Sequence, residues 1–96
     1  MKRMTREWIR KAEDDFQAAV ILAAEAKSLH DPICFHCQQS AEKYLKALLE
    51  ELGLVVPRTH DLENLLALLR PHYVSLRRYR RGLRSLKRFA VEPRLG

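Results

Sequence analysis

Residues 31–53, DPICFHCQQSAEKYLKALLEELG, decide the fold. Apolar side chains recur in this stretch at helical spacing, which places them on one face of a helix. That face consists of Cys37, Ala41, Tyr44, Leu45, Leu48, Leu49 and Leu52. Asp31 suits the N-cap, Pro32 the first helical position, and Gly53 a left-handed residue after the last turn. The stretch is therefore predicted to be one amphipathic helix.

The same periodicity precedes this helix. It predicts a helix from about residue 5 to about residue 28, with Thr5 as its N-cap. Its expected buried face consists of Trp8, Ile9, Ala12, Phe16, Ala19, Val20 and Ala23.

Two more helices are predicted after Gly53. The run 54–57, LVVP, is short and ends in proline, so we expect an extended connection rather than a strand. A third helix is expected to begin at Thr59 or His60 and to end by Pro71, with Asp61 and Glu63 near its positive end. Its buried stripe is Leu62, Leu65, Leu66 and Leu69, and a fourth helix carries Leu76, Tyr79, Leu83, Leu86 and Ala90. The sequence thus predicts an all-α, antiparallel up-and-down four-helix bundle that forms one domain over residues 1–96.

Composition restricts the partners and the compartment. The chain has 96 residues and a net charge of +6, so an acidic or phosphorylated partner is favoured over a basic one. Its apolar runs are shorter than the ~20 residues that cross a bilayer, and residues 1–10 do not resemble a signal peptide. We therefore expect a cytoplasmic protein with no membrane partner and with reduced cysteines.

The positive charge is concentrated in the last quarter of the chain. Residues 1–69 hold nine Lys or Arg and eleven Asp or Glu, whereas residues 70–96 hold nine basic residues and one acidic residue. A single stripe of the fourth helix carries Arg77, Arg81, Arg84 and Arg88. This stripe is either a phosphate or RNA contact, a solvated face, or a surface that docks an acidic helix of a partner subunit.

The cysteines and histidines do not form a recognisable metal or redox motif. Cys34 and Cys37 have C-x-x-C spacing, but the βαβ context of redox proteins is missing, so two buried apolar cysteines are the better interpretation. The sequence offers no second pair with ligand spacing, so neither a metal site nor a cofactor is predicted. Two histidine pairings are candidates for acid–base catalysis: His60 beside Asp61, and His36 three and seven residues before Gln39 and Lys43. Alternatively, Asp61 only caps the helix and His60 satisfies backbone groups at the helix end.

A polar run accompanies the apolar face of the second helix. Gln39 and Lys43 share a side of this helix, and Asp14 or Asp15 of the first helix is expected to supply a carboxylate to the run. The run consists of Gln38, Gln39, Ser40, Glu42, Lys43 and Lys46. It is either a satisfied structural layer or the wall of a nucleotide-sized cleft.

Residues 35–49, FHCQQSAEKYLKALL, resemble the signature helix of HEPN domains, the small helical "higher eukaryote and prokaryote nucleotide-binding" family. Residues 12–16, 59–62 and 88–96 resemble the family's first helix, its entry to the third helix and the turn after the fourth. The resemblance implies a helical bundle that commonly dimerises, and prokaryotic members often sit beside a minimal nucleotidyltransferase as a toxin–antitoxin or related pair.

Several HEPN branches are metal-independent RNases that use an arginine followed a few residues later by a histidine. Here Arg58 and Arg70 stand only two residues before His60 and His72, and the chain ends two residues after Arg94. These departures argue against RNase activity by that route. The resemblance also implies that the family's usual final helix is absent or truncated, which would leave an apolar groove for a second copy or another protein.

The resemblance therefore implies a HEPN-type module that is non-catalytic or catalytically degenerate, dimerises and serves a nucleotidyltransferase partner. The residues expected to line its nucleotide cleft are Asp15, Gln39, Glu42, Lys43 and His60. One alternative is an RNA-cleaving toxin in which Arg84, Arg88 and Arg94 hold phosphate and His60 or His72 moves protons; another is a basic RNA-binding module.

Overall fold

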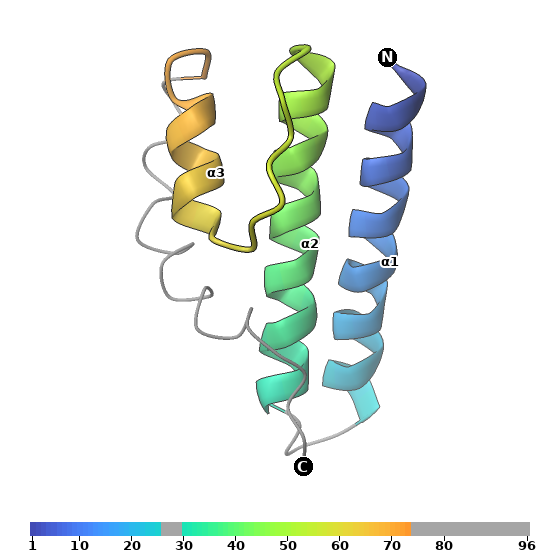
Figure 1. Ribbon diagram of the computed structural model, residues 1–96. Helices are drawn as coiled ribbons and strands as arrows, with labels where there is room; N and C mark the ends of the chain where they lie inside the picture. The colour runs from blue at the N-terminus through green and yellow to red at the C-terminus, as the bar shows by residue number, and fades with distance from the viewer. Residues whose placement is uncertain (26–29, 74–96) are drawn as a thin grey trace.

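The computed structural model of the chain describes residues 1–25 and 30–73 (Figure 1). Three helices follow one another in this part: α1 (Arg3–Glu25), α2 (His30–Glu51) and α3 (Leu62–Leu69). α1 and α2 run antiparallel, and α2 lies between α1 and α3 (Figure 1). The described residues contain no strand, so the all-helical prediction is confirmed there. The predicted fourth helix, with Leu76 to Ala90, lies outside the described residues.

α1 begins earlier than the sequence predicts, and fewer of its apolar side chains are buried. It starts at Arg3, so Thr5 is a buried residue inside the helix, and its prediction as N-cap is wrong. Ala12 and Ala19 are buried as expected, whereas Phe16 and Val20 are exposed. Within the described residues α1 packs only on α2, so its buried stripe is narrow and the flanking apolar positions face outward.

Small side chains line the contact between the first two helices. Thr5, Ala12 and Ala19 of α1 are buried, and so are Ser40 and Ala47 of α2. Small residues allow the two helix backbones to approach closely and pack without gaps. The polar groups described below lie beside this contact.

α2 ends as its sequence predicts. Gly53 has φ 76°, in the left-handed region that glycine adopts without a steric penalty. The amides of Gly53 and Leu54 donate to the carbonyls of Glu50 and Leu49, each at 3.0 Å. This bonding pattern is the Schellman motif, which satisfies carbonyls at the end of a helix. The chain then reverses as an extended segment without strand structure, as predicted.

α3 begins at Leu62, two residues after His60 and three after Thr59, the two predicted starts. Asp61 is its N-cap, and its side chain accepts hydrogen bonds from the amides of Glu63 and Asn64. The hydroxyl of Thr59 accepts from the Asp61 amide at 3.1 Å, which orders the turn before the cap. An N-cap aspartate satisfies amides that have no partner within the helix, so the helix starts after Asp61.

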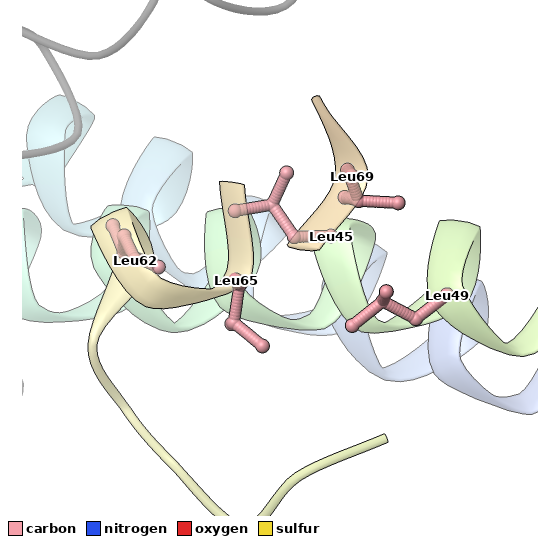
Figure 2. Packing of buried hydrophobic residues seen from close by; sticks show 5 residues of the cluster. All are labelled: Leu45, Leu49, Leu62, Leu65 and Leu69. Atoms are coloured by element: carbon pink, nitrogen blue, oxygen red, sulfur yellow. The ribbon is translucent and has the colours of Figure 1, made fainter. Parts of the chain in front are cut away.

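A cluster of five leucines fixes α3 against α2. Figure 2 shows the side chains of Leu45 and Leu49 meeting those of α3. The cluster consists of Leu45, Leu49, Leu62, Leu65 and Leu69, and Leu66 is buried as well. The predicted α3 stripe is therefore confirmed.

Tyr44, by contrast, was predicted to be buried and is exposed. α2 is contacted from two sides by α1 and α3, so the flank that carries Tyr44 stays open. None of the helices within 1–25 and 30–73 is long and apolar enough to cross a membrane.

Candidate functional site

The carboxylate of Glu42 is the centre of a buried polar cluster on α2. Its side chain is only 4% exposed, and its two oxygens have different partners. Oε2 accepts from Lys46 Nζ at 2.9 Å, one helical turn further along, and Lys46 is itself only 7% exposed. Oε1 lies 2.9 Å from Nδ1 of His60, which reaches α2 from the connection before α3. A buried carboxylate needs such partners because removal from water penalises its charge.

Two glutamines extend this cluster. Gln38 is fully buried, and its Nε2 lies 3.5 Å from Glu42 Oε1 and 3.3 Å from the carbonyl oxygen of His60. Gln39 Nε2 donates to Gln38 Oε1 at 2.8 Å. The backbone and the side chain of His60 are thus both bound to α2, so the 54–61 connection is held at its far end by polar contacts.

A second polar cluster joins α1 to α2 around Asp15. Asp15 Oδ1 lies 3.0 Å from Nδ1 of His36, and Oδ2 accepts from the ammonium group of Lys43. All three side chains are partly buried. One carboxylate of α1 therefore holds two side chains that stand two turns apart on α2.

Trp8 of α1 lies close to two lysines, one on α1 and one on α2. The ammonium groups of Lys46 and Lys11 lie 5.5 and 5.7 Å from the centre of its ring, within the range of cation–π attraction. Its indole Nε1 is buried and has no hydrogen-bond partner within residues 1–25 and 30–73. An unsatisfied buried donor is costly, so this N–H marks a position where an acceptor would be favourable.

All five predicted cleft residues take part in these clusters, but in two separate groups. Asp15 binds Lys43, whereas Gln39 is linked through Gln38 to Glu42 and His60. Of the two aspartates considered, Asp15 joins the cluster, and Asp14 instead lies near Arg10 on the surface of α1.

Sequence reasoning left three participants out of the predicted cleft: His36, Gln38 and Lys46. Gln38 and Glu42 carried a detectable signal, because they continue the stripe of Leu45 and Leu49 at helical spacing. Polar residues at such positions are buried beside the core and require partners. Lys46 follows Glu42 by one turn, the spacing at which opposite charges meet on a helix.

The remaining candidates among the described residues do not join the clusters. Cys34 and Cys37 are half-buried and are not joined by a disulfide. Burial, assisted by the nearby Cys34, raises the pKa of Cys37 above its ordinary value. His72 lies exposed in the turn after α3. Residues 1–25 and 30–73 contain no group of three or more potential metal-binding side chains. Four predicted phosphate contacts, Arg77, Arg81, Arg84 and Arg88, lie outside the described residues, as does Arg94.

Fold and site together define a small helical module with charged clusters on both sides of its central helix. The chain belongs to the HEPN domain family, whose profile matches residues 5–96. Neither a search of curated proteins nor a search of solved structures gave a significant match. Family membership confirms the resemblance noted in the sequence and supports a helical module of a generally nucleotide- or RNA-related kind.

Proposed function

We propose that this protein is a non-catalytic HEPN module that binds a nucleotide at the α1–α2 polar face, self-associates, and serves a minimal nucleotidyltransferase partner. The observation that carries the nucleotide site is the convergence of Lys43 and His36 on Asp15. Trp8 stands two turns before Asp15 on the same side of α1, and its indole N–H has no hydrogen-bond partner among the described residues. The self-association and the nucleotidyltransferase partner follow from what the HEPN resemblance implies.

The chemistry of this face suits the two ends of a nucleotide. Lys43 and His36 are partly exposed donors that share one carboxylate, so a phosphate group can replace Asp15 as their partner. Gln39 lies one turn before Lys43 on α2, and although its Nε2 donates to Gln38, its side-chain oxygen can accept from a base or a ribose. The carboxylate of Asp15 can accept as well. Lys11 adds a positive charge at the Trp8 end of the same face.

Titration calorimetry with ATP and GTP tests the site. The wild-type chain is expected to bind at least one of them, and Lys43→Ala is expected to weaken binding at least tenfold by removing the phosphate partner. Lys2→Ala is the matched control, because Lys2 stands at the N-terminal end of the molecule and donates to the Glu50 carbonyl at 3.2 Å. Unaltered binding in Lys43→Ala, or no binding by the wild type, would refute the assignment.

The Glu42–His60 pair favours a second candidate, a metal-independent RNase. A carboxylate only accepts hydrogen bonds, so Nδ1 of His60 carries the proton and Nε2 of the neutral ring has a free lone pair. The His60 side chain is 66% exposed, so Nε2 can reach a substrate, and an oriented imidazole of this kind is a competent general base.

RNA incubated with the metal-free protein distinguishes the two candidates. The non-catalytic proposal predicts that the RNA stays intact. Cleavage that is lost in His60→Ala or in His72→Ala would establish the RNase instead. His60→Gln with retained cleavage would exclude proton transfer by His60.

A further inference from the structure

An apolar pocket opens between α1 and α2, on the flank of α2 that carries Tyr44. Its volume is about 230 Å³. The lining residues are Met1, Thr5, Ile9, Tyr44, Ala47, Leu48 and Glu51. An apolar cavity of ~150 Å³ is large enough to hold a benzene ring, so this pocket has room for one aromatic side chain.

The same flank of α1 carries a large exposed aromatic residue. Phe16 is 55% exposed and follows the pocket residue Ile9 by seven positions, which returns it to the same side of the helix. At ~1.5 Å per residue, the two positions stand about 10 Å apart along α1. The exposed Val20, one turn beyond Phe16, continues the apolar strip.

We propose that a second copy of this chain docks on this flank, with Phe16 of each copy in the α1–α2 pocket of the other. The proposal rests on the self-association proposed above and adds the contact that produces it. A two-fold axis that pairs two α1 helices antiparallel makes both insertions at once, so the assembly closes as a dimer. The interface is self-complementary because ring and pocket lie on one surface.

Charge complementarity supports a second copy as the occupant. Thr5 and Ile9 are the α1 residues of the pocket, so its centre is level with about position 7 of the helix. A two-fold axis that brings Phe16 of the other copy to this level lies midway between Arg10 and Glu13 along α1. It therefore brings Arg10 of each copy opposite Glu13 of the other. Both side chains are exposed, and Arg10 also pairs with Glu7 and Asp14 of its own helix. The cross-pairing sets the guanidinium against an additional carboxylate on the rim of an apolar contact.

Phe16→Ala tests the contact in the full chain by sedimentation or by size-exclusion chromatography with light scattering. The variant is expected to raise the dimer dissociation constant at least tenfold while circular dichroism shows an unchanged helix content. Ile21→Ala is the matched control, because Ile21 is 53% exposed on α1 but lies about 140° around the helix from Phe16. Ile21→Ala is expected to dimerise like the wild type.

A mixing experiment gives a sharper test. Ile9→Trp fills the pocket from its own wall and leaves Phe16 intact, so this variant alone is expected to dissociate as Phe16→Ala does. Mixed with Phe16→Ala, it supplies one ring to one open pocket, and native mass spectrometry should detect the heterodimer. Absence of the heterodimer, or Phe16→Ala chains that remain as dimeric as the wild type, would overturn the proposed contact.

The outcomes separate this inference from the proposed function. A wild-type chain that stays monomeric refutes both the self-association and the contact. A wild-type dimer that survives Phe16→Ala refutes the contact alone. ATP affinity, measured on the Phe16→Ala variant, is expected to equal that of the wild type, because Lys43 and Asp15 are linked by a direct ion pair to which Phe16 does not contribute.

Discussion

Removal of the Glu42 carboxylate is expected to destabilise the fold severely. In Glu42→Ala the ammonium of Lys46, only 7% exposed, loses the carboxylate oxygen 2.9 Å away. The Trp8 ring, 5.5 Å from the ammonium, does not replace the lost carboxylate, so a buried charge is left without its counter-ion. Breaking a buried ion pair in this way costs about 3–5 kcal/mol. That loss is a large fraction of the ~5–15 kcal/mol by which a domain is stable. His60 adds little to the cost because its side chain is mostly exposed and regains water.

Urea unfolding followed by circular dichroism measures this loss. The double variant Glu42→Leu/Lys46→Met removes both charges, and its free energy of unfolding is expected to return to within about 1–2 kcal/mol of the wild type, because apolar groups often replace a buried pair without loss. His60→Ala serves as the control and is expected to cost less than about 1 kcal/mol. If Glu42→Ala itself costs less than about 1 kcal/mol, the pair behaves as a surface salt bridge and the argument from burial is wrong.

Three further predictions concern packing, capping and thiol chemistry. Leu49→Ala opens a cavity in the buried leucine cluster and should lower the free energy of unfolding by about 2–5 kcal/mol. Leu68 is exposed, so Leu68→Ala should change the free energy of unfolding by less than about 1 kcal/mol. Equal losses in the two variants would contradict the described packing. Asp61→Ala removes the N-cap of α3 and should lower the free energy of unfolding by about 1 kcal/mol in the same assay, whereas Asp61→Asn should keep most of the wild-type stability. An alanine variant as stable as the wild type would argue against the cap. Because burial raises the pKa of Cys37, its thiolate fraction at neutral pH is low, and iodoacetamide should label it more slowly than free cysteine; faster labelling would refute this.

Local spacing explains why so much of the fold was predictable. The α3 leucines repeat every three or four positions, and a glycine after the last turn of α2 has few other roles, so both features follow from short stretches of sequence. The start of α3 was less predictable because Thr59, His60 and Asp61 are all competent near a helix start. The choice among them depends on which side chain is turned back toward the first amides.

Burial on α1 and α2 was less predictable for a different reason. Periodicity identifies an apolar face but not the number of helices that will cover it. Phe16 and Tyr44 have core-like spacing and remain exposed, since α2 is covered by α1 and α3 on two sides with open flanks between them. Which aspartate of α1 would meet Lys43 and His36 of α2 depends on the relative rotation of the two helices, which a single sequence does not encode locally.

The claim that the α1–α2 polar face is a nucleotide site is tested most directly by NMR spectroscopy of the isotope-labelled chain titrated with ATP. The account predicts that the Gln39 side-chain amide, the His36 ring and the Trp8 indole N–H shift together and saturate, while the methyl groups of Leu65 and Leu69 stay in place. Shifts confined to other surfaces, or a spectrum that ATP leaves unchanged, would contradict it.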